Sequence, residues 1–235
     1  MYISPALFIG TAFTYLSSLA AASRSVAIFN VSDSVDTFSG NTIECGLVDF
    51  CHILCLEDSG CTDMTVEASN ATNLLIECVE DSACYEFQLV SGPTNNLSIL
   101  CTDREACRYG HIDIRDLDTV IVKCGYLSCD SLDLRVSDAS SVTAECIAPS
   151  PYCLNDASMN FENVPRILLN ATSFYAFTSG SVYLSSDDTS SETGTFDLVC
   201  DGTRACYDLE IYSTDHDSRY VLAEESRGAM ILRYG

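Results

Sequence analysis

Short segments of alternating apolar and polar residues recur along the chain, and several of them end in a cysteine. In residues 74–78 and 97–101, apolar side chains stand four and two positions before the cysteine. The same arrangement precedes Cys124 and Cys146. Because successive side chains of a β-strand point to opposite faces, this period of two places the apolar residues and the cysteine on one face. The pattern predicts half-buried strands.

A second alternating segment follows each cysteine pair. Its apolar members are Met64/Val66, Phe87/Leu89, Ile112/Ile114, Leu132/Leu134/Val136, Met159/Phe161 and Leu209/Ile211. Residues typical of turns, such as those at 67–70 and 91–96, separate the two kinds of segment. Each repeat is therefore predicted to contain two short strands and two or three corners.

The cysteines form close pairs with a regular spacing. The pairs are Cys45/Cys51, Cys55/Cys61, Cys78/Cys84, Cys101/Cys107, Cys124/Cys129, Cys146/Cys153 and Cys200/Cys206. From Cys55 to Cys146 the first members of the pairs recur at an almost constant interval, which indicates a repeat architecture. The interval from Cys146 to Cys200 is more than twice as long, which fits two repeats, one of them enlarged and lacking the pair.

Two strands in a repeat of 23 residues cannot bury their inner faces alone, so the repeats must stack strand upon strand. The prediction is an all-β fold: a right-handed parallel β-helix of about eight coils with disulfides inside the coils. A coil of this length resembles the pectin-lyase-like architecture more than a hexapeptide left-handed helix, and the leucine-rich repeat signature is absent. An antiparallel β-sandwich is the alternative, although the strict phasing disfavours it.

The two ends of the chain and one long interval shape the predicted domain organisation. Residues 1–22 read as a signal peptide, because an uncharged apolar run over residues 6–22 ends in small residues; an uncleaved anchor or a capping helix is the alternative. Residues 23–235 form one β-helix domain, with an irregular coil at 171–199. No membrane span is expected after the signal peptide. The C-terminal end is expected to be capped by a partner or by further coils.

Composition excludes several functions. With 34 acidic and 11 basic residues, the chain has a formal net charge of -23, which leaves no basic surface for nucleic acid or anionic lipid. Fourteen cysteines indicate an oxidising compartment, and hence a secreted or cell-surface protein. Four N-x-[ST] sequons agree with secretion and predict N-glycosylation at Asn30, Asn70, Asn96 and Asn170.

Disulfides explain the cysteine pairs better than metal ligands do. The spacings are longer than those of zinc knuckles, and His52, His111 and His216 are scattered. Pairing inside each coil is favoured because Cys200 and Cys206 have no cysteine in the preceding coil. An even, periodic set also leaves no odd thiol to act as a nucleophile.

Acidic residues between the paired cysteines are the weak candidates for a metal site. Stacked coils would align them in columns, and clustered carboxylates suit Ca²⁺. The candidates are Glu57, Asp58, Glu80, Asp81 and Asp103. Arg104 would interrupt one column, and a solvated acidic face is the alternative that we favour. No other cofactor is expected.

The alternative function is a carbohydrate-active enzyme, a polysaccharide lyase or glycoside hydrolase with the pectin-lyase-like architecture. The nearest counterparts to the polygalacturonase-like motifs are Asp187-Asp188, Gly110-His111-Ile112 and Arg166-Ile167-Leu168, and the Asn-Thr-Asp motif is missing. The strong negative charge would also repel an acidic polysaccharide. The 34 acidic residues allow many other carboxylate pairs, so the sequence gives no reason to nominate one of them as catalytic. An ice-binding face is disfavoured because the threonines do not recur at one phase.

The cysteine-rich repeat as a whole resembles repeat ectodomains on the surfaces of microbial eukaryotes, and this resemblance carries no functional residues with it. The predicted function is a secreted or cell-surface, non-enzymatic glycoprotein module with a structural, adhesive or ligand-binding role. Its partner is expected to be an extracellular glycan or protein, bound on a face that the N-glycans leave free.

Overall fold

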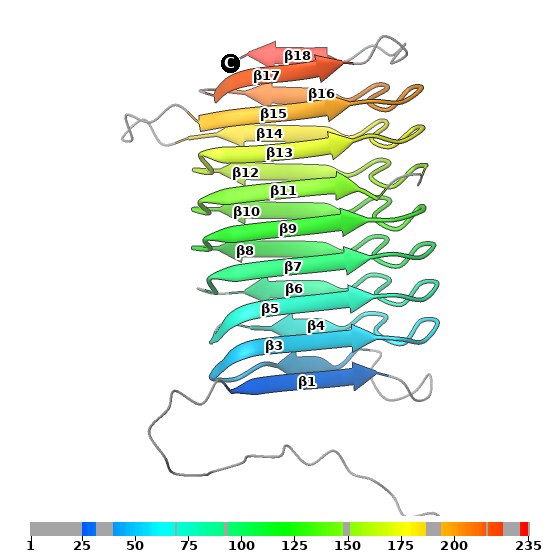
Figure 1. Ribbon diagram of the computed structural model, residues 1–235, viewed down its shortest axis with the longest axis vertical. Coiled ribbons are helices and arrows are strands. Elements are labelled where there is room, and N and C mark those ends of the chain that lie inside the picture. Colours follow the sequence, from blue (N-terminus) through cyan, green and yellow to red (C-terminus); the bar gives the residue numbers. More distant parts are fainter. Residues whose placement is uncertain are drawn as a thin grey trace, which may run out of the picture.

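The chain winds into a parallel β-solenoid whose coils stack along one axis (Figure 1). The computed structural model describes residues 25–31, 40–68, 70–91, 94–147, 151–186, 194–214, 216–222 and 231–234. The predicted signal peptide, residues 1–22, lies outside this part of the chain. No helix that is long and apolar enough to cross a membrane occurs in the described segments.

Two parallel sheets of nine strands each build the solenoid. Sheet A contains, in order, β1 (Val26–Val31), β3 (Val48–Cys55), β5 (Ala71–Cys78), β7 (Asn96–Cys101), β9 (Thr119–Cys124), β11 (Ser141–Cys146), β13 (Arg166–Ala171), β15 (Gly194–Cys200) and β17 (His216–Leu222). Sheet B contains, in order, β2 (Thr42–Glu44), β4 (Thr65–Glu67), β6 (Gln88–Ser91), β8 (His111–Arg115), β10 (Asp133–Ser137), β12 (Ser158–Glu162), β14 (Ser181–Ser185), β16 (Glu210–Ser213) and β18 (Ile231–Tyr234). Each strand pairs with the strands two positions away in the chain, so every coil adds one strand to each sheet.

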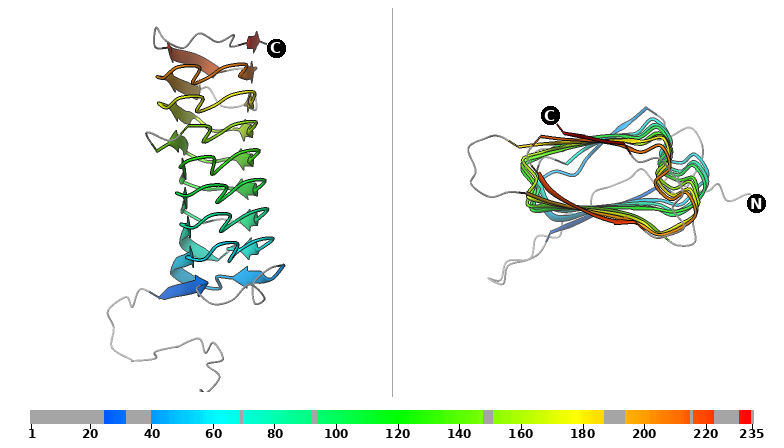
Figure 2. Two further views of the ribbon diagram at one scale, coloured as in Figure 1. Left: turned by 90° about the vertical axis from the view of Figure 1, so that its right-hand side faces the viewer. Right: turned by 90° about the horizontal axis from the view of Figure 1, so that it is seen from above.

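The coil is right-handed. In Figure 1 the strands of sheet A run to the right in front, those of sheet B return to the left behind, and the chain rises from blue to red. The end-on view in Figure 2 shows the two sheets facing each other across an elongated section. The predicted fold class is confirmed, with nine strands per sheet where about eight coils were expected. The cysteine period belongs to sheet A, whose two end strands, β1 and β17, contain no cysteine and therefore lie beyond it.

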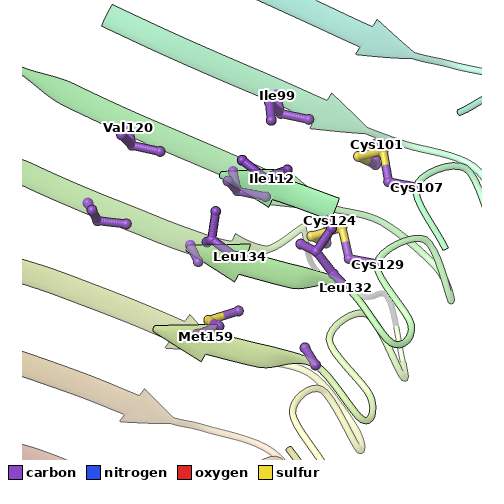
Figure 3. Close-up of a cluster of buried hydrophobic side chains, with 14 of the residues drawn as sticks. Ile99, Cys101, Cys107, Ile112, Val120, Cys124, Cys129, Leu132, Leu134 and Met159 are labelled. Carbon is purple, nitrogen blue, oxygen red and sulfur yellow. A yellow bond between two sulfur atoms is a disulfide. The ribbon is translucent and has the colours of Figure 1, made fainter. Parts of the chain in front are cut away.

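Alternating side chains fill the space between the sheets. In β9, Val120, Val122 and Cys124 are buried, whereas the residues between them are partly exposed. Ile112 and Leu134 reach the same core from sheet B (Figure 3). Because each coil repeats this pattern in register, one continuous apolar core runs along the axis, and its removal from water is the main stabilising term.

All seven disulfides join cysteines of the same coil, so the prediction of pairing inside each coil is confirmed. Six of them close the corner where strands of sheet A end, which we call the disulfide corner. These six are Cys55–Cys61, Cys78–Cys84, Cys101–Cys107, Cys124–Cys129, Cys146–Cys153 and Cys200–Cys206. The strand-end cysteines stack directly, as the register of Cys101 on Cys124 shows. Figure 3 shows the bridges of these two cysteines side by side.

The seventh bridge, Cys45–Cys51, lies at the opposite corner. Cys45 directly follows β2 of sheet B, whereas Cys51 lies inside β3 of sheet A, where it pairs in register with Leu74 and is buried in the core. The bridge therefore joins the two sheets where the chain passes from sheet B to sheet A. The expectation that a second alternating segment follows each cysteine pair is wrong for this pair, because Cys51 is followed by the end of the first kind of strand.

Cys153 also departs from the regular series. The N–H group of Cys107 donates to the carbonyl of Ser128, the residue before Cys129, whereas the N–H group of Cys129 donates to the carbonyl of Cys153 itself. Cys153 thus stands one loop position earlier than its counterparts in the coils below. The regular series of pairs did not predict this shift. The shift is possible because the loop between Cys146 and Cys153 is longer: their sequence separation is 7, against 6 and 5 in the two coils below. The expected Cys146–Cys153 bond still forms.

The loops at the disulfide corner satisfy their backbone groups in two directions. In the loop of residues 80–87, the N–H groups of Ser82, Cys84 and Glu86 donate to carbonyls of the next coil, at 2.9, 2.6 and 2.9 Å. The intervening N–H groups donate back within the loop, each to the residue three positions earlier. This alternation requires a left-handed backbone at Ser82 and Glu86, both with φ of 57°. The loops therefore stack in register like the strands.

One coil differs from the others in length and in its filling. It extends from β13 to β15, where Ile167 pairs with Phe196, the longest interval between paired residues in sheet A. Ala171 stands at the position of a strand-end cysteine, opposite Cys200, and Phe177 is fully buried in the corner loop of the same coil. The ring of Phe177 thus helps to fill the corner where other coils have a disulfide. Within the predicted irregular interval 171–199, residues 187–193 lie outside the described part of the chain.

Candidate interaction surface

The predicted acidic residues do lie in columns at the disulfide corner. Asp58 and Asp81 occupy equivalent loop positions, because the N–H group of Ser59 donates to Asp81 O as that of Ser82 donates to Arg104 O. Arg104 therefore follows the two aspartates in their column, as the spacing predicted. Glu57, Glu80 and Asp103 form the neighbouring column, one residue earlier in each loop.

These carboxylates make local contacts. Ser59 Oγ donates to Asp58 Oδ1 at 3.4 Å, and Ser82 Oγ donates to Asp81 Oδ1 at 3.4 Å. The backbone N–H of Arg104 donates to Asp103 Oδ1 at 2.8 Å. Among the described residues, the only groups of three ligand-type side chains close enough for one ion are disulfide cysteines, whose sulfurs are already bonded. The geometry therefore adds no support for a calcium site.

The counterparts of the hydrolase motifs are not brought together. His111 lies on the outer face of sheet B, where its Nδ1 is 2.9 Å from Asp133 Oδ2. Arg166 lies on the outer face of sheet A, the opposite side of the solenoid. Asp187 and Asp188 lie outside the described residues. The two residues that can be placed thus cannot share one site.

The four sequons gather on one side of the molecule. Asn30 and Asn170 belong to β1 and β13, Asn96 begins β7, and Asn70 directly precedes β5. All four are therefore in sheet A or at the corner that leads into it. Asn30 and Asn170 even share one outward row of this sheet, because the strand register connects them through every coil between them. Neither sheet B nor the disulfide corner contains a sequon.

The outer face of sheet A is partly apolar. Leu54, Leu75, Leu100 and Ile121 point outward and are half-buried, among polar and charged neighbours. A hydrogen bond and an ion pair between described residues lie on this face: His52 Nε2 is 2.8 Å from Glu77 Oε2, and Lys123 Nζ is 2.5 Å from Glu145 Oε1. The outer face of sheet A therefore mixes apolar and charged side chains.

The outer face of sheet B carries a row of polar and aromatic side chains parallel to the solenoid axis. Consecutive strands place Asp113, Arg135, Asn160, Tyr183 and Tyr212 opposite one another, so that they form one line across five coils. Neighbouring members are separated by the spacing between strands, about 4.8 Å. We call this line the sheet B row.

A hollow lies beside the lower half of the sheet B row. Its lining residues are Asp113, Arg115, Arg135, Val136, Ser137, Asn160 and Glu162, from β8, β10 and β12. The small side chain of Ser137 stands between Arg115 and Glu162, which leaves room in the middle of this second line. The lining contains two carboxylates and two guanidinium groups, so its formal charge is balanced.

Ion pairs hold part of this face in place. Arg135 Nη2 is 2.9 Å from Asp133 Oδ2, which His111 also contacts, and Arg115 Nε is 3.7 Å from Asp113 Oδ1. In contrast, no side-chain hydrogen bond of Asn160 or Glu162 is found within the described chain, and both side chains are exposed. Their amide and carboxylate groups are therefore accessible to a ligand.

An aromatic pair continues the row above the hollow. The rings of Tyr183 and Tyr212 are stacked, with centroids 4.7 Å apart and planes 6° from parallel. Tyr212 Oη donates to Glu210 Oε2 at 2.5 Å, which fixes the second ring. Tyr183 is 42% exposed, so its ring remains accessible at the surface.

The disulfide corner has a polar ladder that the cysteine spacing did not reveal. Arg108 Nε is 2.8 Å from Asp130 Oδ2, and Asn155 Nδ2 donates to Asp130 Oδ1 at 2.9 Å. Thr178 Oγ1 in turn donates to Asn155 Oδ1. Burial lowers the pKa of Arg108, but the attraction of Asp130, followed by that of Tyr109, outweighs this effect and raises it above its ordinary value. The ladder ties four successive coils together.

Sequence reasoning missed the sheet B row because it followed only the inward positions of each strand. The outward residues of the second strand in each repeat were available from the same period of two. Their alignment in one row depends on coils of unequal length, which are clear only from the strand register. Comparison of the chain with models of protein families, with curated proteins and with solved structures finds no match.

Proposed function

We propose that the chain is a secreted or cell-surface glycoprotein module without enzymatic activity, which binds an extracellular partner through the outer face of sheet B. The observation that supports this proposal is the placement of all four sequons in or beside sheet A. N-glycans there would cover the half-buried apolar side chains of that face and keep it from aggregating. Sheet B would remain free for contact.

Further features support an extracellular binding role. Seven disulfides are typical of proteins in oxidising compartments, and the resemblance to cysteine-rich repeat ectodomains agrees with display at a cell surface. Sheet B offers exposed aromatic and hydrogen-bonding side chains in a rigid array, which a ligand can meet without ordering flexible loops. The separation of His111 from Arg166 favours this role over a polygalacturonase-like activity.

The proposal can be tested by adding an N-glycan to one face at a time, so that the glycan blocks a partner from contacting that face. Glu162→Thr creates a sequon at Asn160 on sheet B, and Leu75→Thr creates a matched sequon at Asn73 on sheet A. Both proteins and the wild type would be secreted from a eukaryotic host and tested for binding to immobilised glycans and extracellular matrix proteins. Binding should be lost with the sheet B glycan and retained with the added sheet A glycan.

A further control separates the glycan from the substitution itself. Combining Glu162→Thr with Asn160→Gln removes the new sequon, so any effect that persists in this double variant is due to the side chains. Glycopeptide mapping would establish occupancy at Asn30, Asn70, Asn96 and Asn170. Loss of binding with Leu75→Thr alone, or binding by none of the proteins to any probe, would contradict the proposal.

A further inference from the structure

From the sheet B row and the hollow beside it, we infer that this face binds an extended, uncharged glycan lying parallel to the solenoid axis. The inference rests on the proposed function and adds the chemical class of the partner and its orientation. It also assigns a site: Asp113, Arg135, Asn160, Glu162 and Tyr183, with Tyr212 behind the last ring.

The spacing of the row suits a linear polymer. Strand pairing sets successive side chains about 4.8 Å apart, which is close to the advance of one sugar unit in an extended β-linked glycan. Five coils therefore present one recognition group each to about five sugar units. A ligand lying across the sheet, along a single strand, would meet only two or three outward side chains.

The charge of the site favours an uncharged partner. The chain carries a formal net charge of -23, yet the hollow contains two carboxylates and two guanidinium groups. Arg115 and Arg135 also have acidic neighbours, Asp113 and Asp133, that they already contact. A polyanion would be repelled by the whole molecule, and a polycation would meet the two arginines. Sugar hydroxyls can use both the donors and the acceptors.

The ring of Tyr183 supplies the apolar part of the site. It is 42% exposed, with Tyr212 stacked on one face at 4.7 Å and Asn160 next to it in the strand register on the other side. The exposed part of this preorganised ring can contact the apolar face of a pyranose with little loss of conformational entropy. Beside it, Asn160 and Glu162 offer an amide and a carboxylate that can bind hydroxyls of the adjacent sugar.

The test measures binding of neutral hexasaccharides to the secreted protein by titration calorimetry. The probes are β-linked oligomers of glucose, mannose and N-acetylglucosamine, with oligogalacturonate and chitosan oligomers as the charged comparisons. We expect binding of at least one neutral oligomer, weakened about tenfold or more by Tyr183→Ala and also weakened by Asn160→Ala. Tyr183→Phe should retain most of the affinity, because the ring is preserved.

Tyr126→Ala is the matched control. Tyr126 is 45% exposed, close to the 42% of Tyr183, but it lies at the disulfide corner, so its removal should leave the affinity unchanged. Circular dichroism would verify that each variant keeps the wild-type fold. Binding of charged oligomers only, equal losses for both tyrosine variants, or no binding of any oligomer would overturn the inference. If the chain binds a protein instead, and the N-glycan added by Glu162→Thr blocks that binding, the inference fails but the proposed function stands.

Discussion

Left-handed backbone at non-glycine residues is the main local cost of this structure. The seven described loops at the disulfide corner each contain two such residues, with φ between 52° and 59°. Serine and aspartate occupy many of these positions, but Leu127, Tyr152 and Tyr175 are bulky. Each non-glycine residue in this conformation costs about 1 to 2 kcal/mol relative to a relaxed backbone. The hydrogen bonds between stacked loops impose this conformation whatever the side chain.

Relief of this strain should stabilise the protein. Glu86 is exposed and has φ of 57°, so Glu86→Gly removes the clash of its Cβ and should raise the free energy of unfolding by about 1 kcal/mol. Glu67→Gly in β4 is the control, because extended backbone gains nothing from glycine and should lose about 0.5 to 1 kcal/mol. Guanidinium unfolding measures both. Equal destabilisation by the two variants would refute the argument.

At the scale of the element, most coils are closed by their own disulfide, yet the bridges of neighbouring coils approach one another. The sulfurs of Cys55, Cys61 and Cys84 lie within 4.8 Å of one another, as do those of Cys78, Cys84 and Cys107. Pairing inside the coil is therefore not imposed by distance alone. A free thiol in the stack would have a neighbouring disulfide within reach.

Removal of one cysteine should accordingly redirect the pairing. In Cys61→Ala, the thiolate of Cys55 can attack the Cys78–Cys84 bridge at Cys84, forming a Cys55–Cys84 bond and releasing the thiol of Cys78. Peptide mapping after alkylation should find that bond and a labelled Cys78.

Cys206→Ala provides the contrasting case. Cys200 pairs in register with Ala171 of the preceding coil, which has no cysteine, so its thiol should remain free and be labelled itself. Labelling confined to Cys55 in the Cys61→Ala variant would contradict the predicted exchange.

At the scale of the whole molecule, charged residues and N-glycosylation sequons are unevenly distributed over the surface. The excess of acidic residues includes the columns of Glu57, Glu80 and Asp103 and of Asp58 and Asp81, in which like charges of successive coils are neighbours. Repulsion within these columns opposes stacking and is screened by salt. The solenoid should therefore be more stable at higher ionic strength.

A rise from about 0.05 to about 0.5 M NaCl should raise the melting temperature by a few degrees, the shift expected for about 1 kcal/mol in a protein of this size. CaCl₂ and MgCl₂ should act like NaCl at matched ionic strength, because the structure gathers no set of three carboxylates among its described residues. Differential scanning calorimetry measures the shift. A larger effect of CaCl₂ than of MgCl₂, removed by Asp81→Asn, would instead establish the calcium site.

The sequence by itself determined which side chains face the core and how the cysteines pair. The period of two placed residues such as Val120 and Ile112 in the core, and the regular cysteine period predicted stacked coils with intra-coil disulfides. Both predictions succeed because burial and loop closure act within a single repeat, where spacing along the chain is a sufficient guide. The same spacing could not show that Cys51 lies inside a strand, because which corner a bridge closes depends on where each strand ends.

Only the tertiary structure decided which outward-facing side chains are neighbours. The row from Asp113 to Tyr212 consists of one residue from each of five coils, and its alignment depends on the register across coils of unequal length. The placement of Asn30 and Asn170 on one face, opposite that row, depends on the same register. Outward side chains do not pack in a core, so no hydrophobic period in the sequence marks their positions. Their neighbours follow only from the backbone hydrogen bonds between coils, which set the strand register.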